Sequence, residues 1–208
     1  MKSGEHQSFK REDVRVEARN REYDGYFKVD AYDLNHPLYL GGRSESLRRL
    51  VFERGRVGAV LPYDPRRDEV VLIEQFRPGP WAAGEHCWLL ESVAGVLEDG
   101  ESPQELCLRE AMEEAGCAIT RLVLMHRFFT SPGASTELVD LFCGETDTSE
   151  VGGVHGLASE GEDILVKSMP REEAEALLAS GGIVNAKTII SLQWLMLNHQ
   201  RVRDEWLG

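Results

Sequence analysis

The segment AGVLEDGESPQELCLREAMEEAGC, residues 94–117, concentrates carboxylates beside and along one short helix. Local signals mark both ends of this helix. Ser102 is a natural N-cap, Pro103 suits the first helical position, and Glu105 completes an S-x-x-E capping box. Gly116 stands where a glycine commonly ends a helix. Helical spacing predicts an apolar stripe formed by Leu108, Ala111, Met112 and Ala115.

The same helix brings the carboxylates of Glu110, Glu113 and Glu114 close together, and like charges at this spacing repel. They crowd the last turn, where the helix dipole disfavours anions, and Arg109 is the only cation nearby. One interpretation is the solvated acidic face of an ordinary amphipathic helix. The other is a site for a hard divalent cation, Mg²⁺ or Mn²⁺, which prefers oxygen ligands. The crowding of charge favours the metal site.

The rest of the chain combines strand-like and helical patterns. Alternating runs from Val14 to Arg54 predict short strands, with YDG and NHPLYLGG as turns. Further strands are predicted at VGAVLPYD, EVVLIEQF, CWLLESVAGV, RLVLMHRFFTSPG and ELVDLFCGET. Helices are predicted at PREEAEALLAS and in the C-terminal segment, where the stripe comprises Ile189, Leu192, Leu195 and Leu197. This mixed pattern places a domain boundary near Glu53–Val57.

Composition and charge exclude several classes of protein. Hydrophobic residues make up 42% and charged residues 28% of the chain, as in a globular protein with a core. No window approaches the roughly 18 apolar residues of a membrane span, and the first residues lack the apolar region of a secretory signal. The net charge of −13 argues against sequence-independent nucleic-acid binding. The spacing of the cysteines fits neither disulfide pairs nor zinc ligands, which predicts reduced thiols in the cytoplasm.

The spacing of the fixed residues in the acidic segment resembles the Nudix box, G-x5-E-x7-R-E-U-x-E-E-x-G-U, in which U is apolar. Five residues separate Gly95 from Glu101, and seven more lead to Arg109–Gly116, so every fixed position matches. The apolar positions hold Ala111 and Cys117, which are smaller than the usual aliphatic residues. The resemblance implies an α+β Nudix fold, with a mixed β-sheet between α-helices, and hydrolysis of a nucleoside diphosphate linked to another group.

The resemblance also implies roles for residues of the box. Glu110 and Glu114 would hold Mg²⁺, or alternatively Mn²⁺. Gly95 would let the backbone turn tightly, so that the carbonyl of Ala94 also reaches the metal. Glu113 is the acid beside these ligands, and Arg109 would orient the loop through an ion pair with Glu101.

A second acidic segment, GLASEGEDI, reads as a solvated Gly-containing loop when taken alone. In the related enzymes a glutamate-bearing loop at this place closes over the metals. The resemblance makes Glu160 the general base and Glu162 a metal ligand, with Glu98 as an alternative base.

Residues outside the box resemble bacterial ADP-ribose pyrophosphatases over most of the chain. Pro132 in TSPGAS stands sixteen residues beyond Gly116, at a proline position typical of Nudix enzymes acting on ADP-ribose. The segments LPYDPRRDEVVLIEQFRPG and WLLESVAGVLEDGES point the same way. The resemblance implies a homodimer in which an N-terminal antiparallel β domain, residues 1–55, is exchanged between subunits, and a Nudix hydrolase domain at 56–208.

The resemblance assigns substrate contacts to aromatic, arginine and loop residues. Aromatic residues of the partner's N-terminal domain would sandwich the adenine, and arginines would face the substrate. The expected contacts are Tyr26, Phe27, Arg49, Arg54, Arg77, Gly95, Ser131, Pro132 and Gly133. Taken without the resemblance, strand aromatics are commonly core residues, and exposed arginines are commonly solvated. Leu50 departs from the family pattern, in which a polar residue can stand there.

The sequence thus predicts a Mg²⁺-dependent cytoplasmic enzyme that hydrolyses ADP-ribose to AMP and ribose 5-phosphate, with no nucleic-acid or membrane partner. Two alternatives stay open. One is a Nudix pyrophosphatase for another nucleotide sugar, such as GDP-mannose. The other is a non-catalytic Nudix domain that senses a ligand, although a sensor has no need for three repelling carboxylates.

Overall fold

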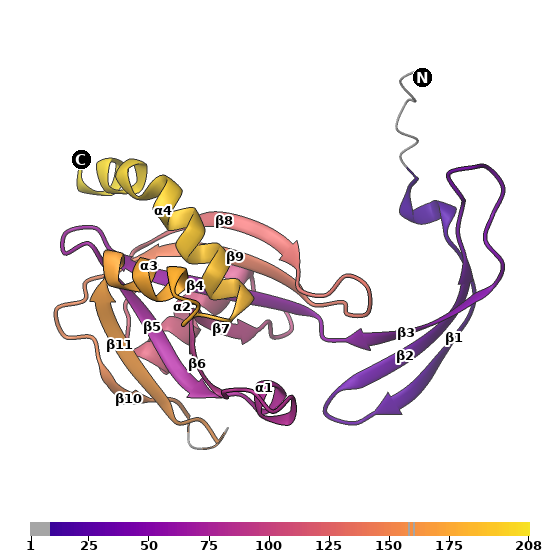
Figure 1. The fold of residues 1–208 in the computed structure, drawn as a ribbon, viewed down its shortest axis with the longest axis horizontal. Coiled ribbons are helices and arrows are strands. Elements are labelled where there is room, and N and C mark those ends of the chain that lie inside the picture. The colour runs from indigo at the N-terminus through magenta and orange to yellow at the C-terminus, as the bar shows by residue number, and fades with distance from the viewer. Residues whose placement is uncertain (1–8, 158, 160) are drawn as a thin grey trace. The chain divides into compact units, whose positions relative to one another are not determined.

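The computed structural model describes residues 9–157, 159 and 161–208 (Figure 1). The chain divides into two compact units, which are described one at a time. The first unit comprises Met1–Gly55 together with Phe129–Glu137, and the second comprises Arg56–Phe128 and Leu138–Gly208. The segment Phe129–Glu137, which contains the SPG sequence, therefore packs with the N-terminal residues although it lies far from them in the chain.

The first unit contains one three-stranded antiparallel sheet of order β1-β2-β3, as the sequence predicts. A single 3₁₀ turn at Arg11–Asp13 precedes β1 (Arg15–Asp24), β2 (Lys28–Asn35) and β3 (Leu47–Glu53). Both predicted turns are confirmed, since Gly25 N–H bonds Phe27 O across the first and Pro37 bridges Arg43 in the second.

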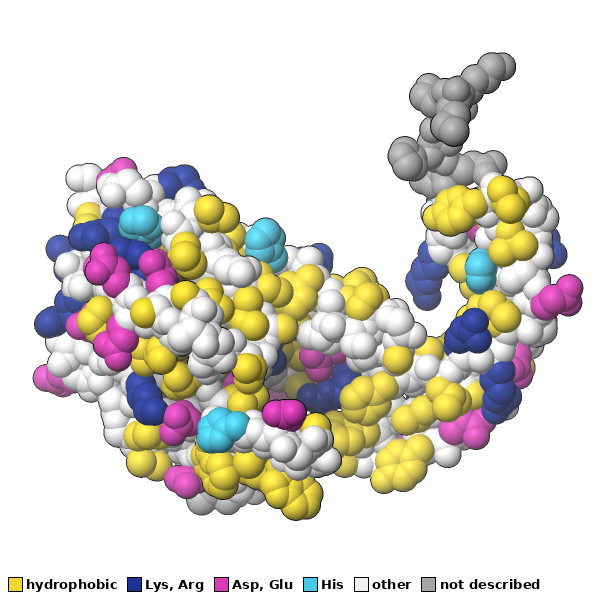
Figure 2. Space-filling view, in the orientation of Figure 1, with side chains coloured by type: hydrophobic (Ala, Val, Ile, Leu, Met, Phe, Trp, Pro, Cys, Tyr) yellow, Lys and Arg dark blue, Asp and Glu magenta, His cyan; other side chains and the backbone are white. Residues whose placement is uncertain are grey.

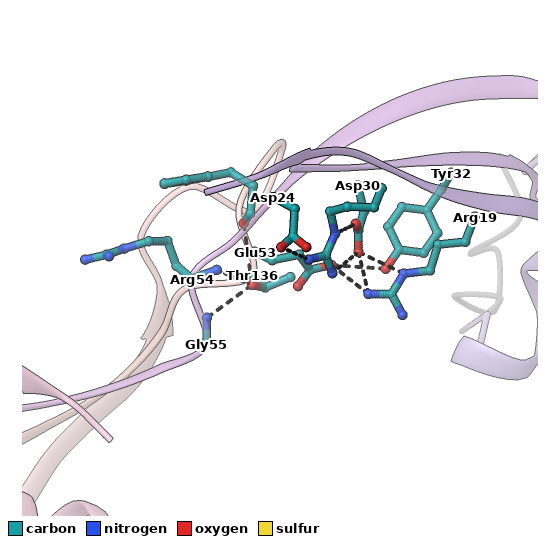
Figure 3. A network of polar contacts seen from close by, with 10 residues as sticks. Arg19, Asp24, Asp30, Tyr32, Glu53, Arg54, Gly55 and Thr136 are labelled. Carbon is teal, nitrogen blue, oxygen red and sulfur yellow. Dashed lines mark hydrogen bonds and ion pairs between the residues drawn. The ribbon is translucent and has the colours of Figure 1, made fainter. Parts of the chain in front are cut away.

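A buried carboxylate organises the polar face of this sheet (Figure 3). Asp30 on β2 accepts hydrogen bonds from Arg19 and Arg21 of the neighbouring strand β1. These bonds hold the pKa of Asp30 below its usual value. Glu53 at the end of β3 accepts a hydrogen bond of 3.0 Å from the Tyr32 hydroxyl. The network ties all three strands together by side chains as well as by backbone.

The second unit is built on a mixed sheet of order β10-β11-β5-β4-β9-β8, with β6 paired to β5 and β7 to β4. β4 runs parallel to β9 and antiparallel to β5 and β7. The strands are β4 (Arg56–Asp64), β5 (Glu69–Phe76), β6 (Trp88–Glu91), β7 (Val93–Val96), β8 (Arg121–Phe129), β9 (Leu138–Glu145), β10 (Gly153–His155) and β11 (Ile164–Pro170).

Helices cover both faces of this sheet, which confirms the predicted Nudix layering (Figure 1). α2 (Pro103–Ala115) packs on one face, where Ala111 and Ala115 join a core that includes Val60 of β4. α3 (Arg171–Ala179) and α4 (Ala186–Leu207) pack on the other face, where Leu192 and Leu195 join Leu61. Strand alternation explains this division, because successive residues of β4 point to opposite faces. A short helix, α1 (Pro78–Ala82), follows β5.

The predicted boundaries of α2 are confirmed, and its predicted apolar stripe is half correct, since Ala111 and Ala115 are buried. Ser102 caps the helix, Glu105 completes the capping box, and Gly116 adopts the left-handed conformation with φ 63°. Leu108 and Met112, however, are 43% and 52% exposed. The buried residues of α2 are instead Leu106, Cys107, Ala111, Glu114 and Ala115. The helix presents its small residues to the sheet, because Gly58 of β4 leaves room for close approach: a Cβ there would lie 2.6 Å from Leu106 Cδ2.

Two further expectations need correction. The segment CWLLESVAGV is not one strand but two, which break at Ser92 and pair with different partners, β5 and β4. In α4, Leu192 and Leu195 are buried as predicted, whereas Leu197 is 87% exposed. α1, β10 and β11 lie in segments for which the sequence analysis predicts no helix or strand.

All four cysteines, Cys87, Cys107, Cys117 and Cys143, are free and buried. Within the part of the chain that the structure describes, no helix has both the length and the apolar character to span a membrane.

Candidate active site

The start of the acidic segment is strand β7, which lies against β4 with Ala94 opposite Ala59 and Gly95 opposite Gly58. Gly95 does not make a tight turn, so that expectation is wrong: it sits inside the strand without a positive φ. Its missing side chain matters for space instead. A Cβ at Gly95 would lie 1.9 Å from Oε1 of Glu110, so glycine lets this carboxylate approach the strand.

Glu114 is the most deeply buried acid of α2, with only 3% of its surface exposed. Its Oε2 accepts a hydrogen bond of 3.2 Å from the backbone N–H of Ala94. Burial, and next the charge of Glu110, raise the pKa of Glu114 to about 8. The negative charge of Glu114 is therefore costly in the protein without a cation.

Glu110 lies beside Glu114, one turn earlier on α2. Burial raises its pKa, the ion pair with Arg109 opposes that effect, and the charges of Glu113 and Glu162 add to the rise. The predicted metal ligands Glu110, Glu114 and Glu162 are thus electrostatic neighbours, because the charge of Glu162 raises the pKa of both Glu110 and Glu114, and the charge of Glu110 raises that of Glu114.

Arg109 holds three carboxylates at once. Its Nε and Nη2 donate to Glu101 at 3.0 and 3.3 Å, which is the expected ion pair. Its Nη1 donates to Glu110 at 3.0 Å and to Glu113 at 2.9 Å. One guanidinium therefore joins the loop before α2 to two glutamates of the helix.

The second acidic loop is described in part. Glu160 lies outside the described residues. Glu162 folds back on the loop, where its Oε2 accepts a hydrogen bond of 3.0 Å from the backbone N–H of Leu157. Glu98, the alternative base, has its backbone N–H bonded to Glu101 at 3.1 Å.

Arg77 follows β5 and is held by a residue that the sequence analysis missed. Its Nε and Nη2 donate to Oε2 of Glu91 at 2.9 and 2.6 Å. Burial lowers the pKa of Arg77, but the hydrogen bond with Glu91 and the charges of Glu114 and Glu162 outweigh it and raise the pKa overall. Arg77 therefore faces the same acids as the proposed metal.

The other predicted substrate contacts lie in the first unit, where several of them cluster. Phe27 packs edge-to-face with Tyr26 at 4.8 Å and with Phe52 at 5.1 Å between ring centroids. The guanidinium of Arg54 lies 5.1 Å from the Phe27 ring centroid and donates through Nε to Glu137 at 3.3 Å. Tyr26 is 90% exposed, so its ring is not a core residue.

Arg49 and the SPG sequence remain open to solvent in this unit. Arg49 is exposed, and its Nη1 donates only to the carbonyl of Arg48 at 3.2 Å among the described residues. Ser131, Pro132 and Gly133 are exposed and form a turn closed by a hydrogen bond from Ala134 N–H to Ser131 O.

Comparison with known proteins identifies the framework that carries these groups. Residues 53–190, more than half of the chain, match the NUDIX domain. This chain belongs to the Nudix family. It is 45% identical over 199 residues to the ADP-ribose pyrophosphatase of Escherichia coli (strain K12), covering 96% of this chain and 95% of that protein.

Other relatives of this Nudix protein are named either ADP-ribose pyrophosphatase or GDP-mannose pyrophosphatase. The ADP-ribose pyrophosphatase of Haemophilus influenzae is 38% identical over 203 residues, with 96% of this chain and 94% of that protein covered. The GDP-mannose pyrophosphatase of Cronobacter sakazakii is 41% identical over 156 residues, which cover 72% of this chain and 78% of that protein. A crystal structure of an ADP compounds hydrolase matches with a TM-score of 0.66 at 19% identity, over 91% of this chain and 97% of that chain, which supports the fold alone.

The acids of this Nudix protein fit a divalent cation chemically. Among the described residues, no three His, Cys, Asp or Glu side chains are already arranged for coordination. Glu110 turns to Arg109, and Glu114 turns to the Ala94 amide. Both carboxylates nevertheless have raised pKa values, which means that their negative charges are unfavourable without a nearby cation. Oxygen is the ligand atom that Mg²⁺ or Mn²⁺ prefers.

Glu91 and Asn185 are the site residues that the sequence analysis did not find. Asn185 Nδ2 donates to the second oxygen of Glu91 at 2.8 Å, although the two residues lie far apart in the chain. A signal was present, because Glu91 is the only charged residue in the otherwise apolar run WLLESVAGV. A lone acid in such a run is buried only with a partner, and that partner cannot be read from local sequence.

Proposed function

We propose that this Nudix protein hydrolyses ADP-ribose to AMP and ribose 5-phosphate with the help of Mg²⁺. The supporting observation is the extent of the match to ADP-ribose pyrophosphatases. That match spans 96% of the chain and so takes in both compact units, whereas the GDP-mannose pyrophosphatase match to the Cronobacter protein covers 72%. The first unit contains the aromatic and arginine residues expected to bind the nucleotide.

The residues of the second unit supply the chemistry. A divalent cation held by Glu110, Glu114 and Glu162 would neutralise the diphosphate oxygens and favour attack by water. Arg77 binds a phosphate oxygen and opposes the negative charge of the surrounding acids. Arg109 keeps Glu110 and Glu113 from repelling each other.

The proton of the attacking water needs an acceptor that is not a metal ligand. We assign this role to the carboxylate of Glu160, from its place in the sequence, with Glu98 as the alternative. As the proton passes to Glu160, the water oxygen would bond to one phosphorus while the bridging P–O bond of the diphosphate breaks, and the bridging oxygen would leave on the other phosphate to give AMP and ribose 5-phosphate.

We also propose that the protein acts as a homodimer that exchanges residues 1–55, the N-terminal part of its first unit. Among the described residues of the first unit, only Asp30 and Ala31 are buried. Hydrophobic side chains remain on the surface of this unit (Figure 2). The exposed ones include Tyr39, Leu40 and Leu50. A segment with so small a core does not stabilise itself, and a second copy of the chain would cover these residues. The free cysteines support a reducing compartment such as the cytoplasm.

Release of the nucleoside monophosphate from each member of a panel of nucleotide sugars, with and without Mg²⁺, tests the activity. ADP-ribose should be the preferred substrate, and hydrolysis should stop when the metal is chelated. Preference for GDP-mannose would replace the substrate assignment, and binding without hydrolysis at any metal concentration would identify a sensor. Light scattering that found a fully active monomer at micromolar concentration would disprove the dimer.

A further inference from the structure

A buried chain of hydrogen bonds runs from Arg77 to the start of α4 through Glu91. Oε2 of Glu91 accepts from Nε and Nη2 of Arg77, at 2.9 and 2.6 Å, and Oε1 accepts from Nδ2 of Asn185 at 2.8 Å. The Glu91 side chain is 2% exposed. Both of its oxygens therefore have protein partners, and both of these partners are donors.

Asn185 is itself held in place. It is the N-cap of α4, and its Oδ1 accepts from the backbone N–H of Thr188 at 3.3 Å. The hydroxyl of Thr188 accepts from the backbone N–H of Ser92 at 2.8 Å, and the hydroxyls of Ser92 and Ser191 lie 3.0 Å apart. Thr188, Ser191 and Ser92 are buried. The start of α4 is thus joined to the break between β6 and β7.

Arg77 uses two of the three nitrogens of its guanidinium to bind Glu91. Its side chain is 36% exposed, and in the described part of the chain Nη1 makes no hydrogen bond. A planar guanidinium that is held through Nε and Nη2 has a defined orientation. The position of its third nitrogen, Nη1, is therefore fixed before any ligand binds. A guanidinium without that support would be ordered only on binding, at a cost in side-chain entropy.

We propose that Glu91 and Asn185 are positioning residues that orient Arg77 for a phosphate oxygen of the substrate. This inference rests on the proposed function, because it takes the diphosphate as the ligand of Arg77. The hydrogen-bond pattern explains why residue 91 must be a carboxylate. Two donors meet there, and glutamine offers only one acceptor oxygen and would set its own N–H groups against a donor.

The pattern also supplies a matched rescue. In E91Q, one of the donors from Arg77 and Asn185 loses its acceptor. In N185D, the carboxylate of residue 185 faces that of Glu91, and neither has a proton to donate to the other. In the double variant E91Q/N185D, the amide of residue 91 donates to the carboxylate of residue 185, and its oxygen still accepts from Arg77. The net charge of the double variant equals that of the wild type, and aspartate remains a good N-cap.

The experiment measures kcat and KM for ADP-ribose with saturating Mg²⁺ in the wild type and in these three variants. Each single variant should lower kcat/KM by about 10- to 100-fold, as loss of a supporting residue commonly does, and the double variant should regain most of that loss. In an R77A background, E91Q should have no further effect, because Glu91 acts through Arg77. S191A is the structural control: it breaks the same interface without touching Arg77, so it should lower the melting temperature and leave KM unchanged.

Several outcomes would overturn the proposal: wild-type kinetics in E91Q, no recovery in the double variant, or an equal loss from E91Q with and without Arg77. Failure of the proposed function gives a different result, in which the wild type itself does not hydrolyse ADP-ribose. In that case, NMR relaxation of the Arg77 Nε–H group tests the positioning role without any substrate, because it reports the mobility of the guanidinium. Its mobility should rise in E91Q and fall again in E91Q/N185D, and unchanged mobility would refute the positioning role.

Discussion

Gly95 and Glu110 are in such close approach that a Cβ on Gly95 would lie 1.9 Å from Glu110 Oε1 and 2.5 Å from its Cδ. The side chain of Glu110 on α2 therefore lies directly against the backbone of β7 at Gly95. The glycine of the box is required for space at this point, and its side chain of a single hydrogen leaves Glu110 in place.

G95A should therefore displace the Glu110 carboxylate while leaving the fold intact, because a flexible side chain can move aside more easily than backbone. We expect a higher Mg²⁺ requirement and a loss of activity of about 10- to 100-fold, with a small change in melting temperature. G79A is the matched control, since nothing lies within 4 Å of a Cβ at Gly79. Equal Mg²⁺ dependence in G95A and wild type would contradict the spatial role of Gly95.

Glu114 makes the stability of the metal-free protein depend on pH. Its pKa in the folded protein is about 8, against an ordinary value of 4.5. The folded state therefore binds this proton more tightly than the unfolded state, and stability falls as pH rises between these two values. The loss reaches about 1.4 kcal/mol per pH unit for one proton. Thermal melts in EDTA should show this slope in the wild type and a weaker slope in E114Q.

Addition of Mg²⁺ should reverse the effect, because a cation that binds only the folded state stabilises it. The melting temperature of the wild type at pH 8 should rise more with Mg²⁺ than that of E114Q or E110Q, and both variants should lose most activity. Hydrolysis at wild-type rates by both variants would show that these carboxylates do not hold the metal.

Glu160 and Glu162 should differ in the kind of defect that they cause. E160Q removes the proposed base, so kcat should fall by about 10²–10⁴ with little change in KM. E162Q removes a proposed metal ligand, so half-maximal activity should need more Mg²⁺. Rescue of E160Q by Mg²⁺, or full kcat in that variant, would disprove the assignment of the base, and E98Q would then be measured.

The proposed exchange of the first unit predicts complementation between two inactive proteins. An E110Q chain carries an intact first unit, and an F27A chain carries an intact second unit. If the units are exchanged, one of the two sites in a mixed dimer combines intact parts from both chains. Activity should therefore appear when the two variants are unfolded and refolded together. No gain over the separately refolded variants, despite mixed dimers in native mass spectrometry, would count against exchange.

The sequence by itself determined the local features of this protein. The ends of α2 follow from Ser102, Pro103 and Gly116, because capping and left-handed conformations depend on residues close in the chain. The spacing of the acids along α2 was also readable, since a helix converts sequence distance into position. These signals favoured the metal-site interpretation and revealed the resemblance to the Nudix family, and the resemblance in turn implied the mixed sheet.

Only the tertiary structure decided which side of α2 is buried. Periodicity predicted a stripe of Leu108, Ala111, Met112 and Ala115. Ala111 and Ala115 are buried, but Leu108 and Met112 are exposed and Glu114 is buried in addition. Gly58 of β4 and Gly95 of β7 leave room for side chains of α2, because a Cβ at either position would clash with Leu106 or Glu110. The sequence of the helix alone does not show this close packing.

Contacts between distant segments likewise arise only on folding. Arg77 and Asn185 meet on the two oxygens of Glu91, and no local signal connects β5, β6 and the start of α4. The presence of Glu91 in an apolar run was visible in the sequence. Because a buried carboxylate needs hydrogen-bond partners, its burial also implied that partners exist. Which residues satisfy it depends on the three-dimensional neighbours that the sheet and helix packing create.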